Sequence, residues 1–120
     1  MSYKGVINMY KVYEDSKYIF LVFELLTGGE LYKRLKSQVV YDESQARLIM
    51  FNIFKALAYV HSKNVMHRDL KPENLILRTT TDFELCLVDF GLADFFYSIE
   101  TEKNEYKRCG TPGYVAPEIL

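Results

Sequence analysis

The sequence has 120 residues, of which 49% are hydrophobic and 26% are charged, the mixture of an ordinary globular domain. This composition excludes a disordered tail, a collagen-like repeat and a disulfide scaffold. Fifteen basic and sixteen acidic residues leave a net charge of −1, so we expect no nucleic-acid and no membrane partner. No run approaches the roughly 18 apolar residues of a membrane-spanning helix. Cys86 and Cys109 form no disulfide framework, which indicates a reducing intracellular compartment, the cytoplasm.

Two strands are predicted near the start of the chain. Val6–Tyr13 is rich in β-branched and aromatic residues, and Tyr18–Leu25 is nearly all apolar, which is typical of a strand buried on both faces. The polar residues Glu14–Lys17 between them suit a turn, so the pattern indicates a hairpin. Because an isolated hairpin is only marginally stable, we expect it to belong to a larger sheet.

Two helices are predicted next. A short helix over Glu30–Ser37 follows the break at Thr27–Gly29. The stronger signal covers Glu43–Ser62, where neither Gly nor Pro interrupts the chain, and Asp42 with Gln45 forms a capping-box pattern at its start. We expect a broad apolar face that needs partners on more than one side. Its residues recur at helical spacing: Ala46, Ile49, Met50, Ile53, Phe54, Leu57 and Val60.

The remainder of the chain consists of shorter pieces. Leu75–Leu77 and Glu84–Val88 are predicted strands, and Thr79–Asp82 is the turn between them. Leu92–Arg108 is mixed in charge and is predicted to be a long irregular loop, a kind of segment that is often functional.

Four motifs stand in order along the chain. They are the connector Glu24–Glu30, HRDLKPEN at residues 67–74, DFG at residues 89–91 and GTPGYVAPE at residues 110–118. Together they make essentially the whole chain resemble the middle of a eukaryotic-type protein kinase domain. The family pattern H-R-D-L-x-x-x-N is filled without departure, and the Lys-Pro-Glu inside it resembles the serine/threonine class. No G-x-x-x-x-G-K-[ST] motif occurs, which argues against a P-loop ATPase.

The resemblance implies an α+β, protein-kinase-like two-lobe fold that is incomplete here. Residues 1–23 would be small-lobe strands, residues 24–30 the hinge, and residues 31–120 the large lobe through the activation segment. The glycine-rich loop and the V-A-x-K lysine of the family do not occur, so we expect a fragment that is inactive by itself. Residues 12–15, 25–31 and 110–118 are most similar to calcium/calmodulin-dependent and calcium-dependent protein kinases.

The implied activity is ATP-dependent phosphorylation of protein serine and threonine residues with Mg²⁺. Phosphoryl transfer needs positioning and charge neutralisation more than covalent chemistry. By resemblance, Asp69 would accept the proton of the incoming hydroxyl, Lys71 would contact the transferred phosphate, and Thr111 would bridge the two. Asn74 and Asp89 would hold Mg²⁺, which prefers oxygen ligands.

The connector would bind the nucleotide. Backbone groups of Glu24 and Leu26 would hydrogen-bond the adenine, with Phe23 as the gatekeeper behind it and Ile76 as the apolar floor. Plainer alternatives stay open, namely a strand end and ordinary core packing. Glu30 would bond the ribose or a substrate cation, or be a solvated carboxylate. With Glu73 it indicates substrates that carry an Arg upstream of the phosphoacceptor.

Two residues of the 67–74 motif have a different expected use. His67 is expected to pack beneath Phe90 rather than to act as an acid or base. Arg68 needs an anionic partner, which a phosphate on the following loop could supply. Candidate acceptors are Ser98, Thr101 and Tyr106.

The alternative to an enzyme is a catalytically inactive kinase-like binding or scaffold protein. Degenerate members of this kind usually lose the residues at the positions of Asp69, Asn74 or Asp89. Because all three are present, the sequence favours the enzyme.

Overall fold

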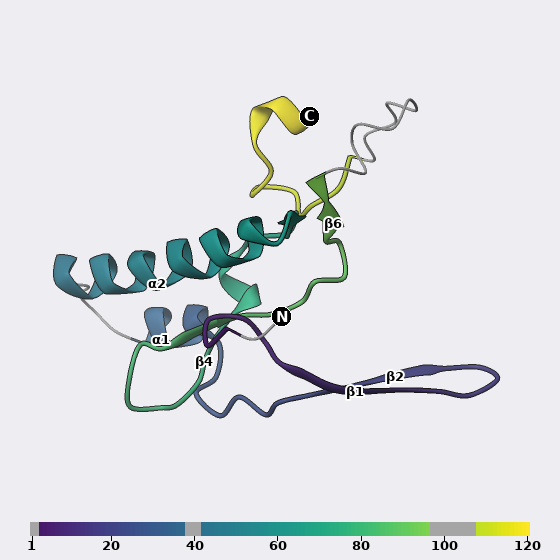
Figure 1. The fold of residues 1–120 in the computed structure, drawn as a ribbon. Helices are drawn as coiled ribbons and strands as arrows, with labels where there is room; N and C mark the ends of the chain where they lie inside the picture. Colours follow the sequence, from purple (N-terminus) through teal and green to yellow (C-terminus); the bar gives the residue numbers. More distant parts are fainter. Residues whose placement is uncertain (1–2, 38–41, 97–107) are drawn as a thin grey trace.

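The computed structural model describes residues 3–37, 42–96 and 108–120, and its elements are mixed α and β as predicted (Figure 1). Strands β1 (Met9–Glu14) and β2 (Ile19–Phe23) form the predicted antiparallel hairpin. The Asp15 carboxylate accepts hydrogen bonds from the backbone N–H groups of Lys17 at 2.7 Å and Tyr18 at 2.8 Å. The turn therefore forms within the polar run, because an Asp side chain can bond the backbone two and three residues on.

The burial of this hairpin differs from the prediction. Every residue of β1 and β2 is exposed, so the expectation that Tyr18–Leu25 is buried on both faces is wrong for the described residues. In Figure 1 the hairpin extends away from the helices. An apolar strand is buried only where a second layer covers it, and composition alone does not supply that layer.

Helix α1 (Leu31–Lys36) lies within the predicted short helix, and α2 (Glu43–Ser62) has the predicted bounds. The Asp42 carboxylate caps α2 by accepting from the N–H of Ser44 at 3.2 Å. The buried face of α2 is narrower than predicted: Met50 and Phe54 are exposed, as is Ala46. The residues that α2 buries are Ile49, Ile53, Ala56 and Val60.

Short strands form the rest. β4 (Leu75–Leu77) pairs antiparallel with β5 (Leu85–Leu87), both close to the predicted bounds. β3 (Val65–Met66) pairs with β6 (Asp94–Phe95), and neither was predicted. Because β6 lies inside Leu92–Arg108, that segment is not irregular throughout.

Two 3₁₀ helices complete the described elements, η1 (Pro72–Asn74) and η3 (Pro117–Ile119). The start of the chain adds to β5, since the N–H of Ile7 donates to the Leu87 carbonyl at 3.0 Å and the N–H of Leu87 donates to the Gly5 carbonyl at 2.8 Å. Helix α2 packs against β3 and β5.

The core therefore lies between α2 and the β4–β5 pair. Its buried residues are Val6, Leu31, Ile49, Ile53, Ala56, Val60, Val65, Leu75, Leu77, Leu85 and Leu87. Residues 67–74 connect β3 to β4, and residues 88–91 follow β5 directly. The same core thus holds both motif-bearing loops in place.

Candidate functional site

The two loops are tied together through their backbones. The N–H of Val88, which precedes Asp89, donates to the carbonyl of Asn74 at 3.0 Å. His67 is 3% exposed, and its Nδ1 accepts from the N–H of Asp69 at 3.2 Å. Nε2 therefore carries the ring proton and donates it to the Val88 carbonyl at 2.9 Å. The ring also meets Phe90 edge-on at 4.8 Å, so His67 is a structural brace, placed as the sequence indicated.

Asp69 is the centre of a closed polar cluster. The carboxylate, in a residue only 8% exposed, accepts from the Thr111 hydroxyl at 2.6 Å and from Lys71 Nζ at 2.9 Å. Lys71 Nζ also donates to the Thr111 hydroxyl oxygen at 2.7 Å. The Thr111 hydroxyl therefore accepts one hydrogen bond from the Lys71 ammonium and donates one to the Asp69 carboxylate.

The hydrogen bonds of this cluster stabilise the charged form of the Asp69 carboxyl group. The hydrogen bond from Lys71 is the largest cause that lowers the pKa of Asp69, and the hydrogen bond from Thr111 is the second. The same pair raises the pKa of Lys71. Both groups are consequently ionised near neutral pH, so Asp69 presents a carboxylate rather than a carboxylic acid.

Two oxygen-bearing side chains flank this cluster. Asn74 is buried, and its Nδ2 donates to the Asp69 carbonyl at 2.9 Å and to the Asp69 carboxylate at 3.2 Å. Its amide oxygen is therefore left as an acceptor. Asp89 is exposed, has a φ of 59°, and accepts from the N–H of Gly91 at 3.2 Å. A left-handed backbone is uncommon for a residue other than glycine.

Comparison with known families decides the class of the protein. Residues 1–120, the entire chain, match the model of the protein kinase domain. The chain belongs to the protein kinase domain family. The α+β kinase fold and the resemblance to calcium-dependent and calmodulin-dependent kinases are thereby confirmed.

Similar curated proteins are serine/threonine kinases of this kind. The chain is 41% identical over 120 residues to a probable myosin light chain kinase of Dictyostelium discoideum and 43% identical over 121 residues to calcium-dependent protein kinase 5 of Plasmodium falciparum. It is 41% identical over 117 residues to the phosphorylase b kinase gamma catalytic chain, liver/testis isoform, of Homo sapiens. These alignments cover 100%, 100% and 96% of the chain but only 37%, 21% and 27% of the relatives.

Residues 67–74 carry the pattern H-R-D-L-x-x-x-N of this family. Arg68 has a φ of 64°, donates from Nε to the Leu92 carbonyl at 2.6 Å and pairs with the Asp94 carboxylate at 3.3 Å. A carboxylate in β6 thus supplies the anion that Arg68 was expected to need. The candidate phosphoacceptors Ser98, Thr101 and Tyr106 lie outside the described residues.

The connector expected to be the hinge runs from the end of β2 along β4. The N–H of Gly28 donates to the Leu77 carbonyl at 3.0 Å, and the N–H of Leu77 donates to the Gly29 carbonyl at 2.9 Å. A Cβ on Gly28 would lie 2.3 Å from the Thr79 carbonyl oxygen, so this close approach requires glycine. Ile76, half-buried in β4, forms a β-bridge with Glu30, whose carboxylate pairs with Lys33 at 2.8 Å.

The expected site residues thus fall into two groups. Lys71, Thr111 and Asn74 all contact Asp69, and the Val88–Asn74 bond places Asp89 beside them. Glu24, Leu26 and Glu30 belong to the connector, and Phe23 and Ile76 belong to the strands β2 and β4 beside it. Phe23 is 43% exposed at the end of β2.

A groove of about 710 Å³ opens beside residues 66–70, between α2 and residues 108–119. Asp69 and Thr111 line it together with Leu57 and His61 of α2. None of the helices in the described ranges is long and apolar enough to cross a membrane.

Sequence reasoning missed two charged residues. Arg78, at the end of β4, bonds Glu24, and Asp94 in β6 bonds Arg68. Each pair joins positions far apart in the chain, so no local pattern could reveal the partner. The signal that was present for Arg78 is a charge placed directly after the buried run Leu75–Leu77.

Proposed function

We propose that the complete protein carrying this chain transfers the terminal phosphoryl group of ATP to serine or threonine hydroxyls of proteins, with Mg²⁺, inside the cell. The observation that supports this most is the closed cluster of Asp69, Lys71 and Thr111. Membership of the protein kinase domain family and the serine/threonine kinase relatives support it as well. Because the chain spans less than two fifths of those relatives, the activity belongs to the whole protein.

Asp69 would orient the substrate hydroxyl and accept its proton. The lowered pKa of Asp69 makes it a weak base but keeps it charged, which suits a late proton transfer in a loose transition state. The hydroxyl oxygen forms a bond to the terminal phosphorus, the bond from that phosphorus to the bridging oxygen breaks, and ADP leaves with the electron pair. Lys71, released from Asp69, would donate to a transferring phosphoryl oxygen, and Thr111 would keep Asp69 aligned.

The residues proposed to hold Mg²⁺ suit that ion. The Asn74 nitrogen is used by Asp69, so its oxygen is the available atom, and Asp89 offers a second, exposed oxygen donor. Among the described residues no group of three or more His, Cys, Asp or Glu side chains could hold a metal by itself. This agrees with Mg²⁺, which is usually held by one or two side chains together with substrate phosphates. When bound, the ion would neutralise phosphate charge during transfer.

The connector would hold the adenine. In the part of the chain that the structure describes, no backbone hydrogen bond uses the Glu24 carbonyl or the Leu26 N–H, whereas the N–H groups of Glu24 and Thr27 are both bonded. This one acceptor and one donor would meet the adenine amino group and ring nitrogen. Phe23 would lie behind the ring and Ile76 below it.

Two carboxylate variants of the complete protein separate the proposed roles. Asp69→Asn should leave Mg²⁺-dependent ATP binding within about threefold and lower peptide phosphorylation by about 10²–10⁴-fold, the range of general-base catalysis. Asp89→Ala should abolish Mg²⁺-dependent nucleotide binding. Glu43→Gln, an exposed acid in the first turn of α2, is the control and should match the wild type.

The outcomes distinguish the enzyme from its alternative. Wild-type turnover in both Asp variants would contradict the assigned roles. A wild-type protein that binds its partners but transfers no phosphate to any peptide would instead be an inactive kinase-like scaffold.

The proposal also includes selection for Arg upstream of the phosphoacceptor, through Glu30 and Glu73. Glu73 is exposed, whereas Glu30 is paired with Lys33 and must exchange that cation for the substrate Arg. In a positional peptide library, Glu30→Ala should weaken the preference for Arg and Lys33→Met should strengthen it, with the KM for ATP unchanged in both. A rise in the KM for ATP without loss of Arg selection would assign Glu30 to the ribose.

A further inference from the structure

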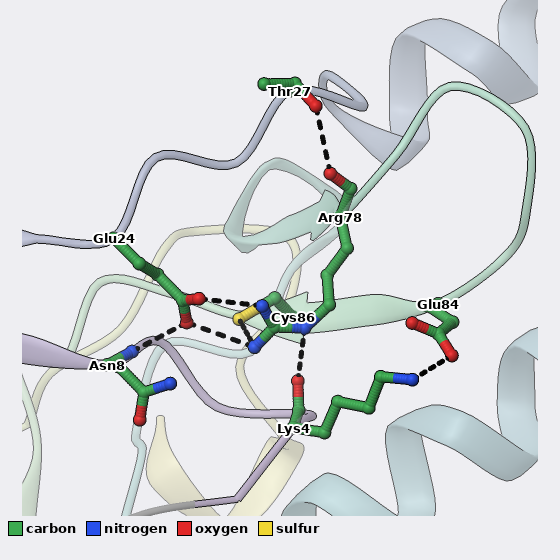
Figure 2. Close-up of polar contacts among 7 residues, drawn as sticks. All are labelled: Lys4, Asn8, Glu24, Thr27, Arg78, Glu84 and Cys86. Atoms are coloured by element: carbon green, nitrogen blue, oxygen red, sulfur yellow. Dashed lines mark hydrogen bonds and ion pairs between the residues drawn. The ribbon is translucent and has the colours of Figure 1, made fainter.

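Arg78 lies where three segments of the chain meet (Figure 2). Its guanidinium bonds the Glu24 carboxylate bidentately, with Nη1 at 2.7 Å from Oε2 and Nη2 at 3.0 Å from Oε1. Its Nε donates to the Lys4 carbonyl at 2.7 Å. A fourth, longer hydrogen bond runs from Nη2 to Cys86 Sγ at 3.7 Å, so the guanidinium at the end of β4 joins the start of the chain, the connector and β5.

Glu24 is held from a second side. Its Oε1 also accepts from the N–H of Asn8 at 2.9 Å, and its own N–H donates to the Asn8 carbonyl at 3.0 Å. The side chains of Glu24 and Arg78 are only 12% and 16% exposed. The bond from Arg78 is the largest cause that lowers the pKa of Glu24, so the pair stays charged at neutral pH.

The main chain of Arg78 holds the far end of the same connector. Its carbonyl accepts from the N–H of Thr27 at 3.2 Å and from the Thr27 hydroxyl at 3.2 Å. Residues 24 and 27 are thus both fastened to Arg78, one by its side chain and one by its backbone. Between them lie the Glu24 carbonyl and the Leu26 N–H, both among the connector groups that no described backbone bond uses.

We propose that Arg78 is a positioning residue for the nucleotide: by fixing Glu24, it sets the place of the Glu24 carbonyl that receives the adenine amino group. This inference rests on the proposed function. It adds a residue that does not touch the nucleotide but determines how well the connector recognises it. Arg suits the task because its planar fork defines the direction of both bonds, whereas a Lys would supply only a point charge.

The structure offers a matched comparison nearby. Lys4 and Glu84 form an ion pair on the same side of the molecule, and their side chains are 68% and 42% exposed (Figure 2). Exposed ion pairs contribute little to stability, and this one fastens neither end of the connector. Lys4→Met therefore removes a neighbouring ion pair while leaving the Lys4 carbonyl that Arg78 uses.

The test uses the complete protein with variants Arg78→Met, Arg78→Lys and Lys4→Met. The nucleotides are ATP and purine riboside triphosphate, which lacks the amino group. Arg78→Met should raise the KM for ATP about tenfold, equivalent to about 1.4 kcal/mol, with kcat and the KM for peptide within about twofold. The KM for purine riboside triphosphate should rise much less, so the preference for the amino group falls. Arg78→Lys should lie between, and Lys4→Met should match the wild type.

Each other result has a definite meaning. Equal increases of KM for both nucleotides would overturn the inference, because Arg78 would then act on the fold in general. An Arg78→Met protein indistinguishable from Lys4→Met would overturn it too. Should Arg78→Met fail to fold by thermal melting, Arg78→Lys decides, with an unchanged KM for ATP counting against the proposal. A wild-type protein that neither binds ATP nor phosphorylates peptides refutes the proposed function itself.

Discussion

Removing the Thr111 hydroxyl tests whether the polar cluster around Asp69 orients a catalytic carboxylate. Thr111→Val keeps the shape of the side chain but deletes the 2.6 Å bond to Asp69 and the acceptor for Lys71. A hydrogen bond to a charged group contributes about 1.5–3 kcal/mol. If all of that energy served the transition state, the rate would fall roughly 10- to 150-fold.

The lower end of this range is expected. Asp69 keeps its bonds from Lys71 at 2.9 Å and from Asn74 at 3.2 Å, so the carboxylate stays partly oriented. The Thr111 bond also exists before substrate arrives, and only the part that strengthens in the transition state affects kcat. In the complete protein we therefore expect about a tenfold loss of kcat, with an unchanged KM for ATP.

The pH dependence gives an independent readout. The charged form of Asp69 is favoured above its ordinary pKa of 3.8 and is lost as the pH falls through the lowered value. Deleting Thr111 removes one cause of that lowering, so the acid limb of kcat should move to higher pH. Thr111→Ser, which keeps the hydroxyl, should restore both rate and profile. A Thr111→Ser protein as slow as Thr111→Val would show that packing, not the hydrogen bond, matters.

Two further results are expected from the structure. Burial raises the pKa of the Cys86 thiol to about 11. Iodoacetamide at neutral pH should therefore modify the half-buried Cys109 and spare Cys86 in the folded protein. Equal labelling of both cysteines, measured by peptide mapping, would contradict the packing of β5. Residues 1–120 produced alone should aggregate and bind a hydrophobic dye, because β1 and β2 expose apolar side chains on both faces. A soluble monomer with a cooperative thermal transition would refute this expectation.

The elements that the sequence predicted well are those with local causes. α2 was predicted with its bounds because a capping Asp42 and an uninterrupted run of helix-compatible residues specify both ends. β4 and β5 follow from short apolar runs on either side of a turn. β3 and β6 were missed because two-residue strands carry no periodic signal, and they form only where tertiary contacts bring Val65 beside Phe95.

Burial was the weakest prediction for the same reason. The pattern of Tyr18–Leu25 correctly indicated a strand, and the positions of Met50 and Phe54 correctly indicated a helix face. Hydrophobicity records that a side chain favours burial but not which element provides it. The described residues leave these side chains exposed.

The motif residues show which side-chain contacts can be predicted from the sequence and which cannot. The five-residue step from Asp69 to Asn74 is short enough for the chain itself to bring them into contact, whereas the contact with Thr111 was expected only from the resemblance to serine/threonine kinases. Arg78 and Asp94 escaped detection because their partners, Glu24 and Arg68, are adjacent only after folding. A kinase motif therefore identifies the groups proposed to act on substrate more readily than the groups that hold them in place.

Two ion pairs of the described residues, Lys71–Asp69 and Arg78–Glu24, differ in a way that matches their proposed uses. Lys71 reaches Asp69 with a single nitrogen that a hydroxyl oxygen also shares, so the lysine can exchange its carboxylate for a phosphoryl oxygen without dismantling the loop. Glu24 and Arg78 instead meet through two directed bonds, and each is bonded again to the main chain of a different segment. Breaking that pair would leave two nearly buried charges without partners, a large penalty. An exchangeable pair suits the reacting centre, and a fixed pair suits the support of a hinge that must present its backbone at one place.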